Sequence, residues 1–251
     1  MPASEVRVIP VRGIGRVARG DDLVETISRA LSRGGVALED GDIVVVTQKV
    51  VSKSEGRLVR LEEVSPTRRA RSIAVELKKD PRLVELVLRE SKRVVRKGQG
   101  VLITETLHGF VCANSGIDMS NVEEGHALLL PVDPDLSARR LRRGLEKATG
   151  RRLAVVVTDT FGRPWRTGQT DVAIGCSGIA PTVDLSGRKD PYGHVLRVTQ
   201  PALVDEVAAA SELVMGKLSM VPVSVVRGVS YARSEAGVRS LVLEGRLDLF
   251  R

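Results

Sequence analysis

The chain has 251 residues, of which 42% are hydrophobic and 28% are charged, and its formal net charge is +8. A chain of this size can bury a sizeable core as one or two lobes, and it has no apolar run long enough to cross a bilayer. Aromatic residues make up only 2% of the chain. This argues against a base-stacking platform for single-stranded nucleic acid, so the positive charge favours small anionic substrates.

Apolar β-branched runs alternate with amphipathic stretches along the chain, and this pattern predicts strands interspersed with helices. We predict strands at residues 6–11, 42–47, 101–104, 127–131, 153–158, 195–199 and 222–226. We predict helices at residues 22–33, 66–79, 82–91, 138–148, 203–217 and 235–244. Ser137 fits the cap of the fourth helix, and Gly150 fits its end. The pattern indicates a mixed α/β class and marks no boundary between lobes.

Cysteines and glycine-rich motifs narrow the chemistry. Cys112 and Cys176 lie too far apart in sequence for a metal knuckle or a redox pair, so we expect two reduced thiols in a cytoplasmic protein. Gly13-Ile14-Gly15 lacks the third glycine of a dinucleotide fingerprint, and Gly216-Lys217 is not followed by the Ser or Thr of a P-loop. Any nucleotide site is therefore of another kind.

Three polar segments with glycines each follow an apolar strand, which is where an α/β protein usually places a site. The first, residues 47–57, contains Lys49, Lys53 and Arg57 among hydroxyl and amide side chains. This composition suits the binding of phosphate oxygens. The alternative is a basic hairpin on the surface, and the residues of this segment alone favour the hairpin.

The second polar segment covers residues 108–121 and places Asn114, Asp118 and Asn121 among small residues. Small neighbours let the backbone approach a ligand closely, and hard oxygen ligands suit Mg²⁺ or Mn²⁺. An Asx turn that caps the next element is an equally good explanation of the same residues. Taken alone, this segment leaves both explanations open.

The third polar segment covers residues 158–169 and favours function over a plain turn. Asp159 stands where the run Ala154-Val155-Val156-Val157 ends, the common position of a metal-binding carboxylate, and Thr160 offers a neighbouring oxygen. A turn explains Asp159 but gives no reason for the nearby arginines. Asp118 and Asp159 as a carboxylate pair, together with basic loops, indicate metal-assisted phosphoryl chemistry.

Longer strings around these three segments match one known family. They are residues 41–57, residues 114–125, and Thr158-Asp159-Thr160-Phe161-Gly162-Arg163, with shorter matches at 187–190, 192–193 and 225–228. They resemble the coenzyme F420-0:L-glutamate ligases, the γ-glutamyl ligases of F420 biosynthesis. The resemblance runs in order from near Val8 to Gly228. Several long strings in one order are more specific than any single motif.

The resemblance implies a fold and an assembly. It implies an α+β, two-lobed fold of the F420 γ-glutamyl ligase type, whose monomers intertwine as a homodimer. Residues 1–251 would then form a single catalytic ligase unit. Because some members of the family carry an extra C-terminal flavin-binding domain, the chain is expected to be either a stand-alone ligase or the N-terminal part of a fusion.

The resemblance also assigns roles to residues. It implies catalytic roles for Asp118, Asp159 and Lys53, and metal binding by Asp118, Asp159 and Thr160. The implied nucleotide contacts are Ile14, Gly15, Arg16, Val17, Gln48, Lys49, Lys53, Asn121, Met215, Gly216 and Lys217. One departure concerns Lys217-Leu218-Ser219-Met220, which is shorter and more basic than the acidic, glycine-rich stretch of archaeal members. The second metal would then bind more weakly, or Lys217 would replace part of its charge.

The implied activity is that of an acid–amino-acid ligase in F420 biosynthesis. It adds L-glutamate in γ-linkage to F420-0, uses GTP and Mg²⁺ or Mn²⁺ with two ions per site, and proceeds through an acyl phosphate; a monovalent cation is also allowed for. The expected partners are these small molecules and a second copy of the chain, with no nucleic acid and no membrane. The alternatives are an amide ligase of the same fold with another acid acceptor, and a non-catalytic nucleotide-binding or RNA-binding protein.

Overall fold

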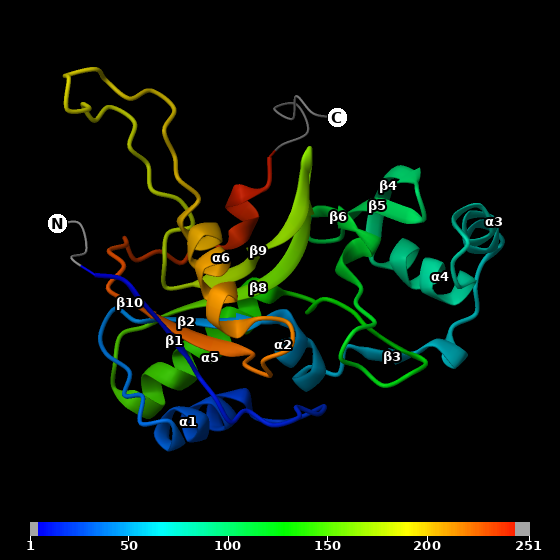
Figure 1. Ribbon diagram of the computed structural model, residues 1–251, viewed down its shortest axis with the longest axis horizontal. Coiled ribbons are helices and arrows are strands. Elements are labelled where there is room, and N and C mark those ends of the chain that lie inside the picture. The colour runs from blue at the N-terminus through cyan, green and yellow to red at the C-terminus, as the bar shows by residue number, and fades with distance from the viewer. Residues whose placement is uncertain (1–4, 244–251) are drawn as a thin grey trace.

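The structure of the protein is a computed structural model, of which residues 5–243 are described. Within these residues it contains six α-helices and three β-sheets, as Figure 1 shows. This confirms the predicted α+β class. No helix in residues 5–243 is long and apolar enough to span a membrane.

The largest sheet has five strands in the order β1 (Arg7–Pro10), β10 (Val223–Arg227), β2 (Ile43–Thr47), β8 (Ala154–Arg163) and β9 (Arg166–Ser177). Only the central pair, β2 and β8, is parallel, and the other pairs are antiparallel. The first four residues of both strands are fully buried. Such uninterrupted apolar runs are typical of strands that are covered on both faces.

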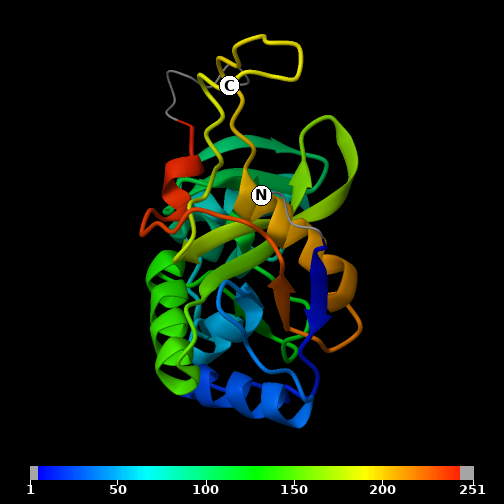
Figure 2. The same cartoon turned by 90° about the vertical axis from the view of Figure 1, so that its left-hand side faces the viewer.

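Helices cover both faces of this sheet (Figures 1 and 2). On one face, α1 (Leu23–Arg33) and α5 (Pro134–Thr149) share a core with Val44 and Val46 of β2, and α2 (Gln48–Ser54) adds to it. On the other face, α6 (Leu203–Met215) packs on Ile43 and Val45. Alternate residues of one strand therefore enter two different cores, as the two-residue period of a strand requires.

A smaller part of the molecule has its own cores and lies on the right in Figure 1. Its elements are β3 (Leu58–Arg60) paired with β7 (His126–Leu128), the sheet of β4 (Ser91–Gly98), β5 (Val101–Thr106) and β6 (Val111–Ala113), and the helices α3 (Arg68–Leu77) and α4 (Pro81–Arg89). Short 3₁₀ turns lie at Leu61–Glu63, Asn114–Gly116 and Val238–Leu241. The last of these turns lies beyond the smaller part and packs beside β9.

Most of the predicted elements are present. The helices α1, α3, α4, α5 and α6 and the strands β1, β2, β5, β7, β8 and β10 each overlap a predicted range. Gly150 ends α5 in the left-handed conformation, as predicted. The prediction of Ser137 as a cap was wrong, because α5 begins earlier: the Asp133 carboxylate accepts from the backbone N–H of Leu136 at 2.9 Å and Pro134 occupies the first position.

Three other predictions were wrong. Residues 195–199 form no strand but lie in an exposed segment, where a single bridge joins Lys189 to Val195. Within the described part of residues 235–244 there is only the turn Val238–Leu241. Asp135 stabilises the start of this turn, because its carboxylate accepts from the backbone N–H of Val238 at 3.0 Å. Residues 47–57 are not a hairpin, because residues 48–54 form α2, which buries Val50 and Val51 in the core.

Candidate active site

The first and third polar segments meet at one edge of the large sheet. β2 and β8 are parallel, and Thr47 pairs with Thr158. The chain leaves β2 directly into α2, whereas β8 continues past this pair with Asp159 and Thr160. Because parallel strands present their carboxyl ends at the same edge, the residues of both segments are placed side by side.

The second polar segment is held against α2 by two lysines. Lys49 Nζ lies 2.7 Å from Asp118 Oδ2 and donates to Ser120 Oγ at 2.6 Å. Lys53, four residues later on the helix, donates to the backbone carbonyl of Asn121 at 2.7 Å. Residues four apart lie on the same helix face, so both ammonium groups point to this segment. The three polar segments therefore come together as one cluster.

The charges in this cluster shift the titration of its members. Burial opposes the ionisation of Asp118, but hydrogen bonds from Lys49 and Ser120 outweigh it and lower the pKa of this carboxyl. Burial lowers the pKa of Lys53, and the cations of Lys49 and Arg16 lower it further. A desolvated group of cations is suited to an anionic ligand that would restore the charge balance.

Asp159 is shifted in the opposite direction. Burial raises its pKa to about 7 against the hydrogen bond from the backbone N–H of Thr160, and the carboxylates of Asp118 and Asp171 add to the rise. Lys217 opposes the rise with its positive charge. Because acidic groups outweigh the charge of Lys217 around Asp159, a bound cation would be favourable there.

The sequence reasoning missed two acidic residues of this cluster. Asp171 interacts with Asp159, and Glu212 interacts with Asp171. Asp171 stands opposite Thr160 in the β8–β9 pair and is only 2% exposed. It accepts from the hydroxyl of Thr160 at 2.5 Å, and Lys217 donates to the same hydroxyl oxygen. Burial and the nearby Asp171 raise the pKa of Glu212. Asp171 becomes visible as a site residue only when the pairing of the two strands is known.

The N-terminal turn contributes one side chain to the cluster. Arg16 lies close enough to Lys53 to affect its titration. Ile14 and Val17 instead pack into the core beneath α1 and α2. A Cβ built on Gly15 would meet open space, so the backbone here is accessible to a ligand.

The other predicted nucleotide contacts point inward or lie at a helix end. Gln48 is 1% exposed and accepts from Ser52 at 2.8 Å, while its Nε2 has no hydrogen-bond partner in residues 5–243. Met215 is buried under the large sheet. Gly216 ends α6 with a positive φ of 53°, which directs the chain so that Lys217 reaches Thr160.

The oxygen groups fit a divalent cation that is completed by substrate. Within residues 5–243 no three His, Cys, Asp or Glu side chains are placed to hold a metal by themselves. Asp118, Asp159 and Thr160 nevertheless offer hard oxygen atoms next to cations suited to phosphate. Mg²⁺ typically takes one or two carboxylates and completes its shell with phosphate oxygens and water. The donor set therefore fits Mg²⁺ or Mn²⁺ bound together with a nucleotide.

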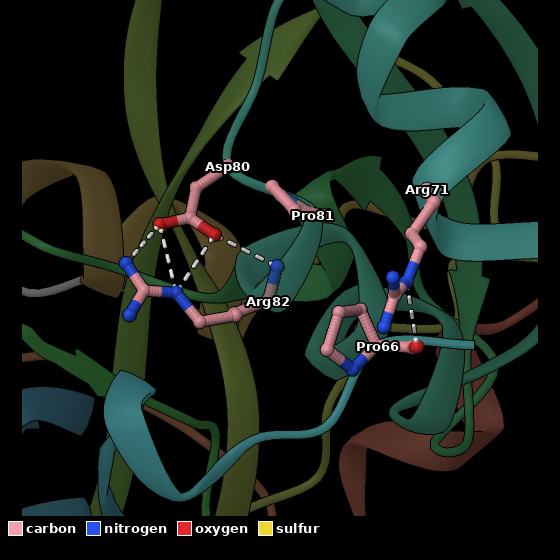
Figure 3. Close-up of a pocket in the computed structure, with 5 residues that line it drawn as sticks. All are labelled: Pro66, Arg71, Asp80, Pro81 and Arg82. Carbon is pink, nitrogen blue, oxygen red and sulfur yellow. Dashed lines mark hydrogen bonds and ion pairs between the residues drawn. The ribbon is translucent and has the colours of Figure 1, made fainter. Parts of the chain in front are cut away.

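A surface cavity elsewhere is chemically different. It has a volume of about 510 Å³ and lies between the starts of α3 and α4, lined by Pro66, Arg71, Asp80, Pro81 and Arg82 (Figure 3). Arg82 donates to both carboxylate oxygens of Asp80, at 3.1 and 2.6 Å, and Arg71 donates to the carbonyl of Pro66 at 3.3 Å. Its polar groups satisfy one another, so we do not consider it the active site.

Comparison with known proteins assigns the chain to a family. A family model described as F420-0:Gamma-glutamyl ligase matches residues 13–228, which include all three polar segments. The chain belongs to this family. It is 47% identical to the coenzyme F420:L-glutamate ligase of Methanothermobacter thermautotrophicus, over 98% of this chain and 99% of that protein. The protein of the same name from Archaeoglobus fulgidus is 47% identical over 98% of this chain and 96% of that protein. The one from Methanopyrus kandleri is 42% identical over 98% of each protein. Because the family and these relatives are ligases, we conclude that this protein is a ligase.

Proposed function

We propose that this ligase joins L-glutamate by an amide bond to the carboxylate of coenzyme F420-0, and subsequent glutamates in γ-linkage, using GTP and a divalent cation. The relatives are named for ligation of L-glutamate to coenzyme F420. The single observation that carries the proposal for this chain is the cluster at the sheet edge. There Lys49 bridges to Asp118 at 2.7 Å beside Asp159, whose pKa is raised to about 7.

The cluster suits the activation of a carboxylate. A carboxylate and an amine do not condense in water, so the acceptor carboxylate must first be activated. We propose that a carboxylate oxygen of F420-0 attacks the γ-phosphorus of GTP, which releases GDP and forms an acyl phosphate. The α-amine of glutamate then attacks the acyl carbon, and phosphate leaves as the amide bond forms. Lys49 and Lys53 would hold the phosphate oxygens as cationic donors.

The metal site belongs to the same proposal. Asp118 and Asp159 would hold one Mg²⁺ or Mn²⁺, and Thr160 would contact a second. A bound divalent cation supplies charge neutralisation for the transferring phosphoryl group. Lys217 already donates to Thr160, and we propose that its ammonium replaces part of the second ion's charge. A monovalent cation remains a further candidate at this position.

We also propose a cytoplasmic homodimer in which each chain is one catalytic unit with two lobes. Residues 184–200, between β9 and α6, project away from the body of the molecule (Figures 1 and 2). Tyr192 and Val198 on this arm are 88% and 89% exposed, and a partner surface would cover them. The two cysteines are free thiols, which fits the reducing cytoplasm. Light scattering of the purified protein, with and without residues 186–198, tests the dimer.

Product mass tests the reaction. We expect purified protein with F420-0, L-glutamate, GTP and Mn²⁺ to yield products heavier by one or more glutamyl residues. Omission of either GTP or metal should abolish the increase. Hydroxylamine added during turnover should trap the acyl phosphate as a hydroxamate. Hydrolysis of GTP without any gain in mass would contradict F420-0 as the acceptor. Equal turnover with ATP would contradict the proposed use of GTP.

A further inference from the structure

The carboxylate of Asp171 is buried, and no cation among the described residues contacts it directly. It is 2% exposed, and its contacts in residues 5–243 are the hydroxyls of Thr160 and Thr158, at 2.5 and 3.3 Å, and the carboxyl of Glu212. Burying a carboxylate is costly unless its charge is compensated. A hydrophobic side chain would fill the same space at lower cost, which suggests that this carboxylate serves the neighbouring site.

The hydrogen bonds at Thr160 define the direction of its hydroxyl. A threonine hydroxyl has one proton to donate and two lone pairs that accept, whereas a carboxylate only accepts and an ammonium only donates. The contact with Asp171 therefore uses the single proton of Thr160. The contact with Lys217 uses a lone pair of the same oxygen. Thr160 Oγ1 thus faces the site as an acceptor.

We propose that Asp171 is a positioning residue for cation binding at Thr160. By accepting the hydrogen bond of the Thr160 hydroxyl, Asp171 keeps the lone pairs of Oγ1 directed toward the site. There they accept from Lys217 in the structure and would bind a divalent cation in the loaded enzyme. Lys217 lies in an exposed segment, so its ammonium can withdraw when a divalent cation arrives. The inference rests on the proposed function, because it takes Thr160 as a cation ligand.

The chain provides a matched control for this role. Asp205 is also an aspartate at the contact between β9 and α6, and it accepts from the backbone N–H of Ala173 at 2.9 Å. Burial raises the pKa of Asp205. In the part of the chain that the structure describes, it has no hydrogen bond to Thr160. Asp205→Asn therefore changes a comparable carboxylate without touching the proposed path.

The test is Mn²⁺ affinity, measured by electron paramagnetic resonance on the purified protein with GDP. We expect Asp171→Leu and Asp171→Ala, which both remove the acceptor, to weaken Mn²⁺ binding by about tenfold, the usual scale for groups that orient a metal ligand. Asp205→Asn should remain within about twofold. Asp171→Leu keeps a branched side chain in the same space, so it decides the matter if Asp171→Ala does not fold.

A double-mutant cycle separates positioning from general destabilisation. If Asp171 acts through the hydroxyl of Thr160, then Asp171→Leu should have no further effect on Mn²⁺ affinity in a Thr160→Val background. Additive effects, an unchanged affinity in Asp171→Leu, or a wild-type protein that binds no Mn²⁺ would each overturn the inference. A protein that shows the expected coupling but ligates no glutamate would support it and contradict the proposed function instead.

Discussion

Two clusters of charged residues contain an aspartate whose pKa is shifted, and the shifts are opposite. In the cavity between α3 and α4, hydrogen bonds from the Arg82 side chain lower the pKa of Asp80. At the edge of the large sheet, burial raises the pKa of Asp159 to about 7. Asp80 has its own guanidinium, whereas Asp159 has the carboxylates of Asp118 and Asp171 nearby, and the ammonium of Lys217 opposes them without cancelling the rise in pKa. A carboxylate whose charge is neutralised by its own arginine supports the fold, whereas a carboxylate whose charge is not neutralised is suited to bind a ligand.

The strongest test of this comparison is to remove the carboxylate of Asp159. We expect Asp159→Ala to lower kcat by at least ~10²-fold, the scale that follows deletion of one positioned electrostatic group. Its thermal stability should be preserved or increased, because a poorly compensated buried carboxyl is removed. Glutamyl transfer measured by product mass, together with a melting curve, checks both. Near-normal turnover would exclude Asp159 from the mechanism.

The second prediction concerns the cations that face Asp118. Lys53→Met should raise the KM for GTP by roughly 10-fold or more, because a hydrogen bond to a charged group is worth about 1.5–3 kcal/mol. Lys79→Met is the matched control: Lys79 donates to Asn114 Oδ1 at 3.4 Å, outside the contacts that Lys49 and Lys53 make. Initial rates over a range of GTP concentrations give both values. Equal changes in the two variants would indicate a general effect of surface charge.

The raised pKa of Asp159 predicts a pH effect on stability in the absence of metal. The folded protein holds this proton more tightly than the unfolded chain, in which an Asp pKa is about 4. The contribution of Asp159 to stability therefore falls as the pH rises from about 4 through about 7. We expect the wild-type protein to lose a few degrees of Tm relative to Asp159→Asn between about pH 5 and about pH 7.

Metal provides the control for this effect. Mn²⁺ with GDP should reduce the difference between the two proteins, because a bound cation favours the ionised carboxylate. Parallel pH dependences of the wild-type protein and Asp159→Asn in metal-free buffer would show that Asp159 titrates in its ordinary range. The uncompensated charge that distinguishes this cluster would then be absent.

How far the site could be predicted from the sequence depends on the range of the interactions. Asp118, Asp159 and Lys49 could be singled out because each lies in a polar segment after an apolar strand. Their mutual contacts could not, because Lys49 and Ser120 are 71 residues apart. Asp171 was missed because its place opposite Thr160 depends on a register shift in the β8–β9 pair, between Val157 and Thr158.

In the fold, too, the elements that follow local sequence patterns could be predicted and the long-range contacts could not. The fully apolar runs of β2 and β8 predicted buried strands, and the structure confirms them. The shorter stretch at residues 195–199, which Arg197 interrupts, misled the prediction, because among the described residues it pairs with no strand and lies on the exposed arm. Residues 47–57 looked like a hairpin from their charges, but Val50 and Val51 are buried against the large sheet. Local pattern predicts an element reliably only where packing supplies the partner that the pattern requires.

The smallest effect is expected at the compensated cluster. Arg82→Ala removes the side chain that neutralises Asp80, but 43% of the Arg82 side chain is exposed, and solvent screens such pairs. Asp80 also keeps the hydrogen bond from the backbone N–H of residue 82, at 2.8 Å, which caps the start of α4. We therefore expect Tm to fall by no more than about 3 °C, with glutamyl transfer and Mn²⁺ affinity unchanged. A loss of transfer in Arg82→Ala comparable to that in Asp159→Ala would show that charge compensation does not separate structural from functional clusters in this protein.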